Sequence, residues 1–297
     1  MKYQKTISFL SGLIILAIVL IWGTGCQYKT LTEPDPVIPS ATIDDADIAM
    51  SVATVITEDG GGVVDQLGDM SVQASNQGIQ AISAGFGGMG SCRHNATYDS
   101  LTQTWTIVIF RERGEPADSV YHLFERTHTL QFLNQAGTPQ KFWITDGDTA
   151  MQIIFDIVSG SGEHKHPHRH HILKSIGGGW TADNVNTDMI TVNGTYQRAA
   201  LDTIFRQNGM RISDHTLDLT LTDVTGPRGS RRDLSQKVSG SITGTYHAFV
   251  TVIKSDTTFT NEITRDINIE LGSGNASITV GGHRYRYNTG TGECQGS

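Results

Sequence analysis

The spacing of apolar residues changes once along the chain, close to residue 90. Before that point apolar residues recur every three or four positions, the period of an amphipathic helix. One such stripe lies within Asp44–Glu58, and a second starts after Gly60–Gly62 and ends before Gly78. Because the glycines separate the two stripes, the pattern predicts a short helical hairpin that covers a sheet.

From Asn95 onward the apolar residues recur at every second position, the period of a β-strand with one buried face. The clearest runs are residues 216–222 and 266–271, in which leucine or isoleucine alternates with polar residues. No helix-length pattern interrupts them, which favours antiparallel pairing. Further strands are expected at Thr104–Phe110, Ser119–Phe124, Thr127–Leu133, Met189–Tyr196, Val238–Ile253, Ala276–Val280 and His283–Tyr287.

The pattern therefore predicts a mainly β fold, an antiparallel meander closed into a sandwich or a barrel and preceded by a short N-terminal helical segment. Closure is expected because it removes the exposed edges of a long sheet. Two similar stretches, Thr191–Tyr196 and Ser241–Tyr246, each place a glycine close to a tyrosine. This combination suits a bend in a long strand.

The first forty residues have the order of a secretory signal. Lys2 and Lys5 precede an apolar run from Phe9 to Trp22, and small residues then lead to Cys26. The run is shorter than the ~20 residues that span a hydrocarbon core, which favours cleavage over a permanent span. The residues that follow are polar and carry three prolines, a composition typical of an extended tether.

The segment from Gly23 to Cys26 resembles the lipobox of bacterial lipoproteins, a family in which the cysteine is lipidated and begins the mature chain. The resemblance implies lipidation of Cys26, although the family usually has leucine, valine or isoleucine in place of Gly23. The alternative is an uncleaved apolar anchor, and both interpretations place the rest of the chain outside the cytoplasm. Gln27 stands where the family's inner-membrane retention signal has aspartate, which implies the outer membrane. The remainder of the chain is similar to uncharacterised β-rich envelope lipoproteins, and this similarity assigns no functional residue.

These features divide the chain into four regions: a signal peptide (1–25), the lipidated cysteine and tether (26–43), a helical and glycine-rich segment (44–90) and an antiparallel β domain (91–297). Loss of the signal peptide removes two lysines and no acid, so the formal net charge changes from −8 to −10. An acidic domain is not expected to bind nucleic acid.

Lipidation of Cys26 would leave two further cysteines, Cys92 and Cys294, in an oxidising compartment. A disulfide between them would close a loop of most of the β domain, which is worth roughly 4–5 kcal/mol in the loop-entropy model. The alternative is a pair of free, buried thiols.

One segment is rich in histidine, with five in eight residues: His164, His166, His168, His170 and His171. If the segment is extended, the even-numbered histidines share one face, with neighbours about 6.7 Å apart. Two imidazoles at this spacing can bind one zinc or copper ion, provided that other parts of the chain supply further ligands. Pro167 favours the alternative of an edge strand or a solvated turn, because proline removes a ladder donor.

The chain contains no Gly-x-Ser-x-Gly elbow, no His-Glu-x-x-His, no phosphate loop and no dinucleotide fingerprint behind a strand. The first hypothesis is therefore an exported, lipid-anchored envelope protein whose β domain, without enzymatic activity, binds or scaffolds an envelope protein or a glycan. The alternative is an envelope protein that binds zinc or copper through the His164–His171 cluster. A third hypothesis is a hydrolase whose site forms only in the tertiary structure.

Overall fold

The computed structural model describes residues 45–57, 61–75, 78–79, 90–207, 209–229, 231, 234–254 and 257–295. The predicted signal peptide, Cys26 and the tether lie outside the described residues, as do residues 80–89 of the predicted helical and glycine-rich segment. Two helices come first, α1 (Asp45–Ile56) and α2 (Val63–Gln73), in place of the two predicted stripes. Among the described helices, none combines the length and the apolar character that a membrane span requires.

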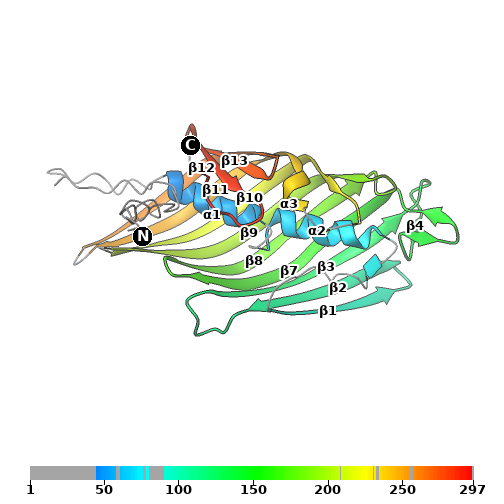
Figure 1. The fold of residues 1–297 in the computed structure, drawn as a ribbon, viewed down its shortest axis with the longest axis horizontal. Helices are drawn as coiled ribbons and strands as arrows, with labels where there is room; N and C mark the ends of the chain where they lie inside the picture. The colour runs from blue at the N-terminus through cyan, green and yellow to red at the C-terminus, as the bar shows by residue number, and fades with distance from the viewer. Residues whose placement is uncertain are drawn as a thin grey trace, which may run out of the picture.

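Twelve strands form one antiparallel sheet in which each long strand pairs with its neighbours in sequence (Figure 1). The prediction of a mainly β antiparallel meander behind a short helical segment is therefore confirmed. The strands are β1 (Gly90–Asp99), β2 (Thr104–Arg113), β3 (Tyr121–Leu133), β7 (Gln152–His166), β8 (Arg169–Asp183), β9 (Met189–Arg206), β10 (Gly209–Pro227), β11 (Ser239–Lys254), β12 (Thr257–Gly272), β13 (Asn275–Val280) and β14 (His283–Asn288). The short β4 (Pro139–Gln140) pairs with β3, β5 (Ile144–Thr145) pairs with β6 (Asp148–Thr149), and α3 (Leu234–Lys237) precedes β11.

The predicted closure into a sandwich or a barrel is wrong, because β1 and β14 end the strand order and do not pair with each other. The sheet instead curves around α1 and α2, which lie along its concave face (Figure 1). The helices thus supply the apolar surface that an opposing sheet or strand would otherwise provide. At the β14 edge the chain folds back, and the backbone of Cys294 forms an isolated antiparallel β-bridge with Tyr287. The outer edge of β1 pairs with no strand in the described part of the chain.

One hydrophobic core joins the helices to the sheet. Along β10 the buried residues alternate with exposed ones, so that Leu217, Leu219 and Leu221 face inward while the threonines and aspartates between them face solvent. Val52 of α1 and Leu67 of α2 belong to the same core. The predicted helical segment and the predicted β domain therefore fold as one unit.

Two glycines explain the repeated stretches found in the sequence. A Cβ atom on Gly194 would lie 2.2 Å from the carbonyl oxygen of Gly179, and Gly194 has a φ of +154°. A Cβ atom on Gly244 would lie 2.0 Å from the carbonyl oxygen of Asp218. Both residues therefore allow a close approach of neighbouring strands that any side chain would prevent.

Candidate functional site

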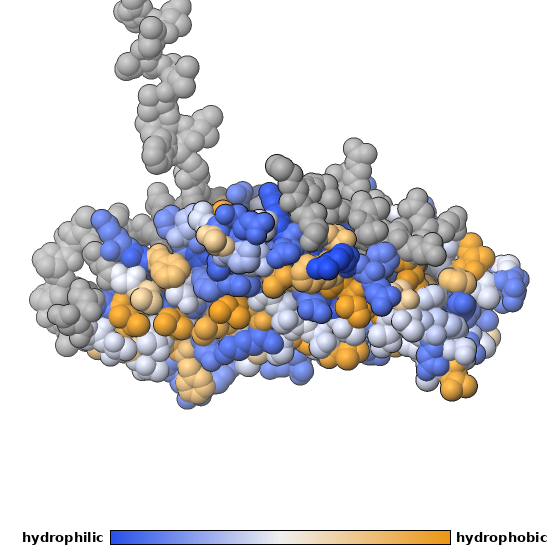
Figure 2. Space-filling view, turned by 90° about the horizontal axis from the view of Figure 1, so that it is seen from below, coloured by the Kyte–Doolittle hydropathy of each residue, from blue (hydrophilic) through white to orange (hydrophobic). Residues whose placement is uncertain are grey.

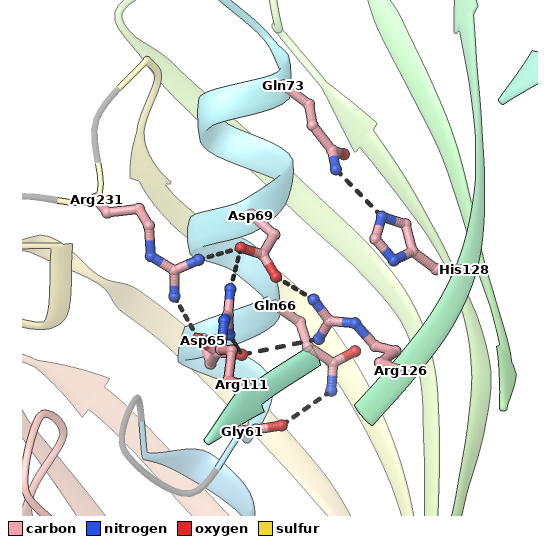
Figure 3. A network of polar contacts seen from close by, with 9 residues as sticks. All are labelled: Gly61, Asp65, Gln66, Asp69, Gln73, Arg111, Arg126, His128 and Arg231. Carbon is pink, nitrogen blue, oxygen red and sulfur yellow. Dashed lines mark hydrogen bonds and ion pairs between the residues drawn. The ribbon is translucent and has the colours of Figure 1, made fainter. Parts of the chain in front are cut away.

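The most unusual group of side chains is a charged cluster buried between α2 and the sheet (Figure 3). Asp65 and Asp69 lie one turn apart on α2, and neither is exposed to solvent. Arg111 of β2, Arg126 of β3 and Arg231, which precedes α3, point toward them. We call these five residues the α2 charge cluster.

Arg111 bridges both carboxylates of the cluster. Its Nη1 donates to Asp65 Oδ1 at 2.6 Å, and its Nη2 donates to Asp69 Oδ1 at 2.6 Å. Arg231 also donates to both aspartates, and Arg126 donates to Asp69. The helix is thus joined to two strands and to the segment before α3 by charge-assisted hydrogen bonds, the stronger class of such bonds.

The cluster carries a net positive charge, since it combines three guanidinium groups with two carboxylates. Burial alone would raise the pKa of Asp69, but the charges of Arg111, Arg231 and Arg126 outweigh it and lower this pKa. Burial lowers the pKa of Arg126, and its two aspartate neighbours oppose that shift. Both aspartates are needed to offset the buried guanidinium charge.

Next to the cluster, α2 makes a neutral contact with the sheet. Gln73 Nε2 and His128 Nε2 are 3.1 Å apart, and the His128 ring stacks on Phe155 with ring centroids at 4.6 Å. Burial is the largest of the effects that lower the pKa of His128 well below its ordinary value. This imidazole is therefore neutral at neutral pH and acts as a hydrogen-bonding partner of the helix.

A second network lies where α1 meets β8 and β9, centred on the buried Asp202. Ser51 Oγ donates to Asp202 Oδ2 at 2.6 Å, and Arg169 Nη2 donates to Oδ1 at 2.8 Å. His171 Nδ1 lies 2.7 Å from the same Oδ1, and His171 Nε2 lies 2.7 Å from Arg198 Nη2. Because arginine can only donate, His171 Nε2 accepts and its proton sits on Nδ1, facing the carboxylate.

Serine, histidine and aspartate are the residue types of a hydrolytic triad, but here they are not hydrogen-bonded in the order that a triad requires, from serine to histidine to aspartate. The Ser51 hydroxyl donates to the carboxylate of Asp202 and not to a histidine nitrogen. The Nε2 atom of His171, the ring nitrogen that does not face Asp202, faces Arg198, which cannot accept a proton. A nucleophile needs the base within hydrogen-bond reach, so this network holds α1 on the sheet and does not activate the serine.

The start of α1 is held by further ion pairs. Asp47 contacts Arg206 at 2.6 Å and also Arg211, on the two strands of the β9–β10 hairpin. Asp45 lies 3.4 Å from Arg265 Nε on β12. Acidic residues of the first helical turn therefore meet arginines from three strands.

The predicted histidine face does not form. A turn at Pro167 and His168 divides the segment into the end of β7 and the start of β8, so that His164 lies opposite His171 and His170 lies opposite Lys165. Proline has no backbone N–H for the ladder, and the chain reverses there. The alternative of a turn at Pro167 is thus confirmed. The prediction that the four even-numbered histidines share one face of a strand is wrong.

Each histidine of the segment has its own surroundings. The His164 ring lies against the ring of His122 on β3, tilted by 31° with ring centroids at 3.8 Å, and burial is the largest cause that lowers the pKa of His164 to about 3. His170 Nε2 lies 2.7 Å from Glu163 Oε1 on the other face of the hairpin, while His166 and His168 are exposed beside the turn. Within the described ranges, no three histidine, cysteine or acidic side chains gather as metal ligands would. The predicted zinc or copper ligand set of His164, His166, His168 and His170 is therefore not assembled.

The predicted disulfide between Cys92 and Cys294 is also wrong, because Cys92 is a free thiol. Cys92 lies on β1, and Cys294 pairs with Tyr287 of β14 at the other end of the strand order. A disulfide needs Cα atoms within about 7 Å. Since the sheet stays open, its two edges do not meet.

Sequence reasoning missed the α2 charge cluster, although a signal was present. In β2, Arg111 occupies the position that follows Ile107 and Ile109 on the buried face. In α2, Asp65 and Asp69 are four residues apart, as side chains on one helix face are. An arginine at an inward-facing position of a strand, together with two aspartates on one face of a helix, is the sequence pattern of a buried ion cluster.

No family model matches this chain, and no curated protein or solved structure matches it either.

Proposed function

We propose that this chain is an exported, membrane-tethered envelope protein whose β domain is a non-enzymatic binding or scaffolding module. The observation that carries the proposal is that α1 and α2, the first described elements after the predicted tether, occupy the concave face of the sheet. Their side chains reach β2, β3, β8, β9, β10 and β12 through ion pairs and hydrogen bonds. A load applied through the N-terminal segment is thereby spread over most of the sheet.

The burial of the charged networks supports a structural role for them. Asp65, Asp69 and Asp202 have no solvent-exposed surface, and a dissolved substrate cannot reach them without movement of the helices. A binding partner would therefore contact the outer surface of the sheet or its edges. The outer edge of β1 offers backbone groups that pair with no described strand, and an envelope protein can bind there by adding a strand.

The tether is tested by changing Cys26 to alanine in the full chain expressed in a bacterial host. Lipidation predicts that labelled fatty acid is incorporated into the wild-type chain and is lost in Cys26→Ala. Membrane fractionation of both chains gives the second readout. A variant that stays in the membrane fraction without the label indicates the uncleaved apolar anchor, and a wild-type chain in the soluble fraction contradicts the proposal.

The binding module is tested by photo-cross-linking from the β1 edge. A photoreactive residue replaces Asn95 or Thr97, both exposed on β1, and the matched control replaces Thr220, exposed in the middle of the sheet on β10. We expect an adduct with another envelope protein or glycan from β1 and none from Thr220. Absence of adducts from β1, together with hydrolysis of esters or glycans by the purified chain, would lead us to abandon the proposal in favour of a hydrolase.

A further inference from the structure

The long strands run between two ends of the sheet, and the described chain enters at one of them (Figure 1). α1 begins at this end, where Asp47 contacts Arg206 and Arg211 at the close of β9 and the start of β10. We call it the tether end, because residues 1–44 precede α1. The opposite end carries the turns between β1 and β2 and between β8 and β9.

Four apolar side chains lie within two residues of the strand ends at the tether end. Phe205 and Met210 pair across β9 and β10 and are 44% and 36% exposed. Ile253 of β11 pairs with Met210 and is half-buried. Phe259, near the start of β12, is 40% exposed and pairs with Val252, so it lies on the opposite face of the sheet from the other three, next to the hairpin end. We call these residues the tether-end patch.

The patch differs from the surface behind it. Further along the outer face of β10 the side chains are polar, beginning with Asp214, Thr216 and Asp218. On the long side of the molecule shown in Figure 2, apolar residues lie in groups that polar residues interrupt. On the same outer face the half-buried Ile212 and the exposed Phe249 lie behind the patch, among threonines and aspartates. The cross-strand row of Phe205, Met210 and Ile253 at the hairpin ends carries three apolar side chains, whereas the next row, Thr203, Ile212 and Thr251, carries one.

We propose that the tether-end patch docks on the lipid surface that holds the N-terminal segment. This inference rests on the membrane tether of the proposed function. The predicted tether, residues 26–43, has a root-mean-square length of roughly 23 Å as a flexible chain, whereas an 18-residue strand such as β9 is about 60 Å long. The tether end is thus the end that the bilayer can reach.

The chemistry of the patch fits a lipid interface. Phenylalanine and methionine side chains on separate hairpins can enter the headgroup boundary to the shallow depth at which amphipathic elements bind. Lys254, exposed at the end of β11, can reach a lipid phosphate. The chain as a whole is acidic, so the apolar contacts and not a general charge attraction would drive docking. Such a contact is weak alone, and the tether raises its effective concentration.

The test uses the full chain in a bacterial host, with the photo-cross-linking residue p-benzoylphenylalanine at one position per variant. Phe205 and Phe259 test the patch. Phe249 is the matched control, since it is 52% exposed on β11 but four residues, roughly 13 Å, farther from the strand end than Ile253. Leu101, 93% exposed in the turn after β1, is the control for the opposite end. After irradiation of isolated membranes, mass spectrometry quantifies phospholipid adducts on each peptide.

We expect at least tenfold more phospholipid adduct from Phe205 and Phe259 than from Leu101, with Phe249 close to Leu101. Equal yields at all four positions, or protein adducts in place of lipid at Phe205, would overturn lipid docking while the chain remains in the membrane fraction. A wild-type chain recovered in the soluble fraction would instead remove the proposed function, and the docking proposal with it. Equal thermal unfolding midpoints for the four variants verify that the substitutions leave the fold intact.

Discussion

Replacement of Asp69 by asparagine is expected to destabilise the fold far more than the loss of a surface ion pair. Asp69 has no exposed surface and accepts hydrogen bonds from Arg111, Arg126 and Arg231. The substitution keeps the size and shape of the side chain but removes its charge. Because the cluster holds three guanidinium groups and two carboxylates, its formal charge rises from +1 to +2.

The magnitude follows from the cost of a buried charge without its partner. Removal of one member of a buried ion pair typically costs about 3–5 kcal/mol, because the buried charge that remains is no longer fully compensated. In Asp69→Asn, of the two carboxylates of the cluster only Asp65 would still face the three guanidinium groups. Domains are typically stable by about 5–15 kcal/mol in total. We therefore expect Asp69→Asn to remove a large fraction of the free energy of unfolding.

Urea unfolding at pH 7, followed by tryptophan fluorescence, measures this change, because Trp143 and Trp180 are buried in the core. With an unfolding slope of roughly 3 kcal/mol per molar urea, the midpoint should fall by about 1–1.7 M. The matched control is Asp214→Asn on the outer face of β10. Asp214 is 55% exposed and lies 2.6 Å from Lys174 Nζ, and such exposed pairs contribute about 0–1 kcal/mol.

The same reasoning predicts an asymmetry within the cluster. Arg126→Met lowers the formal charge of the cluster from +1 to zero, and Arg111 and Arg231 still contact both aspartates. We expect this variant to be less destabilised than Asp69→Asn. Equal losses for Asp69→Asn and Asp214→Asn, or a larger loss for Arg126→Met, would refute the argument that the aspartates offset excess buried positive charge.

Three further predictions concern pH, backbone geometry and cysteine chemistry. Burial of His171 holds its pKa at about 4, so between pH 6.5 and 4 the folded state binds fewer protons than the unfolded state. The free energy of unfolding should then fall by up to about 3 kcal/mol as pH drops through this window, and His171→Gln should reduce the difference between urea midpoints at pH 7 and pH 5. Gly194→Ala should lower the thermal midpoint by several degrees, because its Cβ would meet a backbone oxygen at 2.2 Å, whereas Gly177→Ala, with nothing within 4 Å, should not. Cys92→Ser should leave the thermal midpoint unchanged, since Cys92 is a free thiol; a loss of several degrees would indicate a disulfide to Cys294.

The candidate site shows where sequence reasoning stopped. Pro167 indicated a turn within the histidine segment, and the structure has one there. The sequence did not indicate which residues the histidines contact. His164 lies against His122, 42 positions away, because β3 and β7 pair in a register that places the two residues opposite each other. Asp65 and Arg111 are 46 residues apart, and Asp69 and Arg231 are 162 apart. Contacts of this separation depend on how the elements pack, which no local pattern encodes.

The sequence by itself determined the type and order of the elements, because apolar spacing is a local property of each helix or strand. Val52 and Val55 marked α1, and the leucines of residues 216–222 marked β10. Only the tertiary structure decided that the sheet stays open. Apolar spacing reports that one face of a strand is buried and not what buries it, and here α1 and α2 occupy the space that closure would have filled.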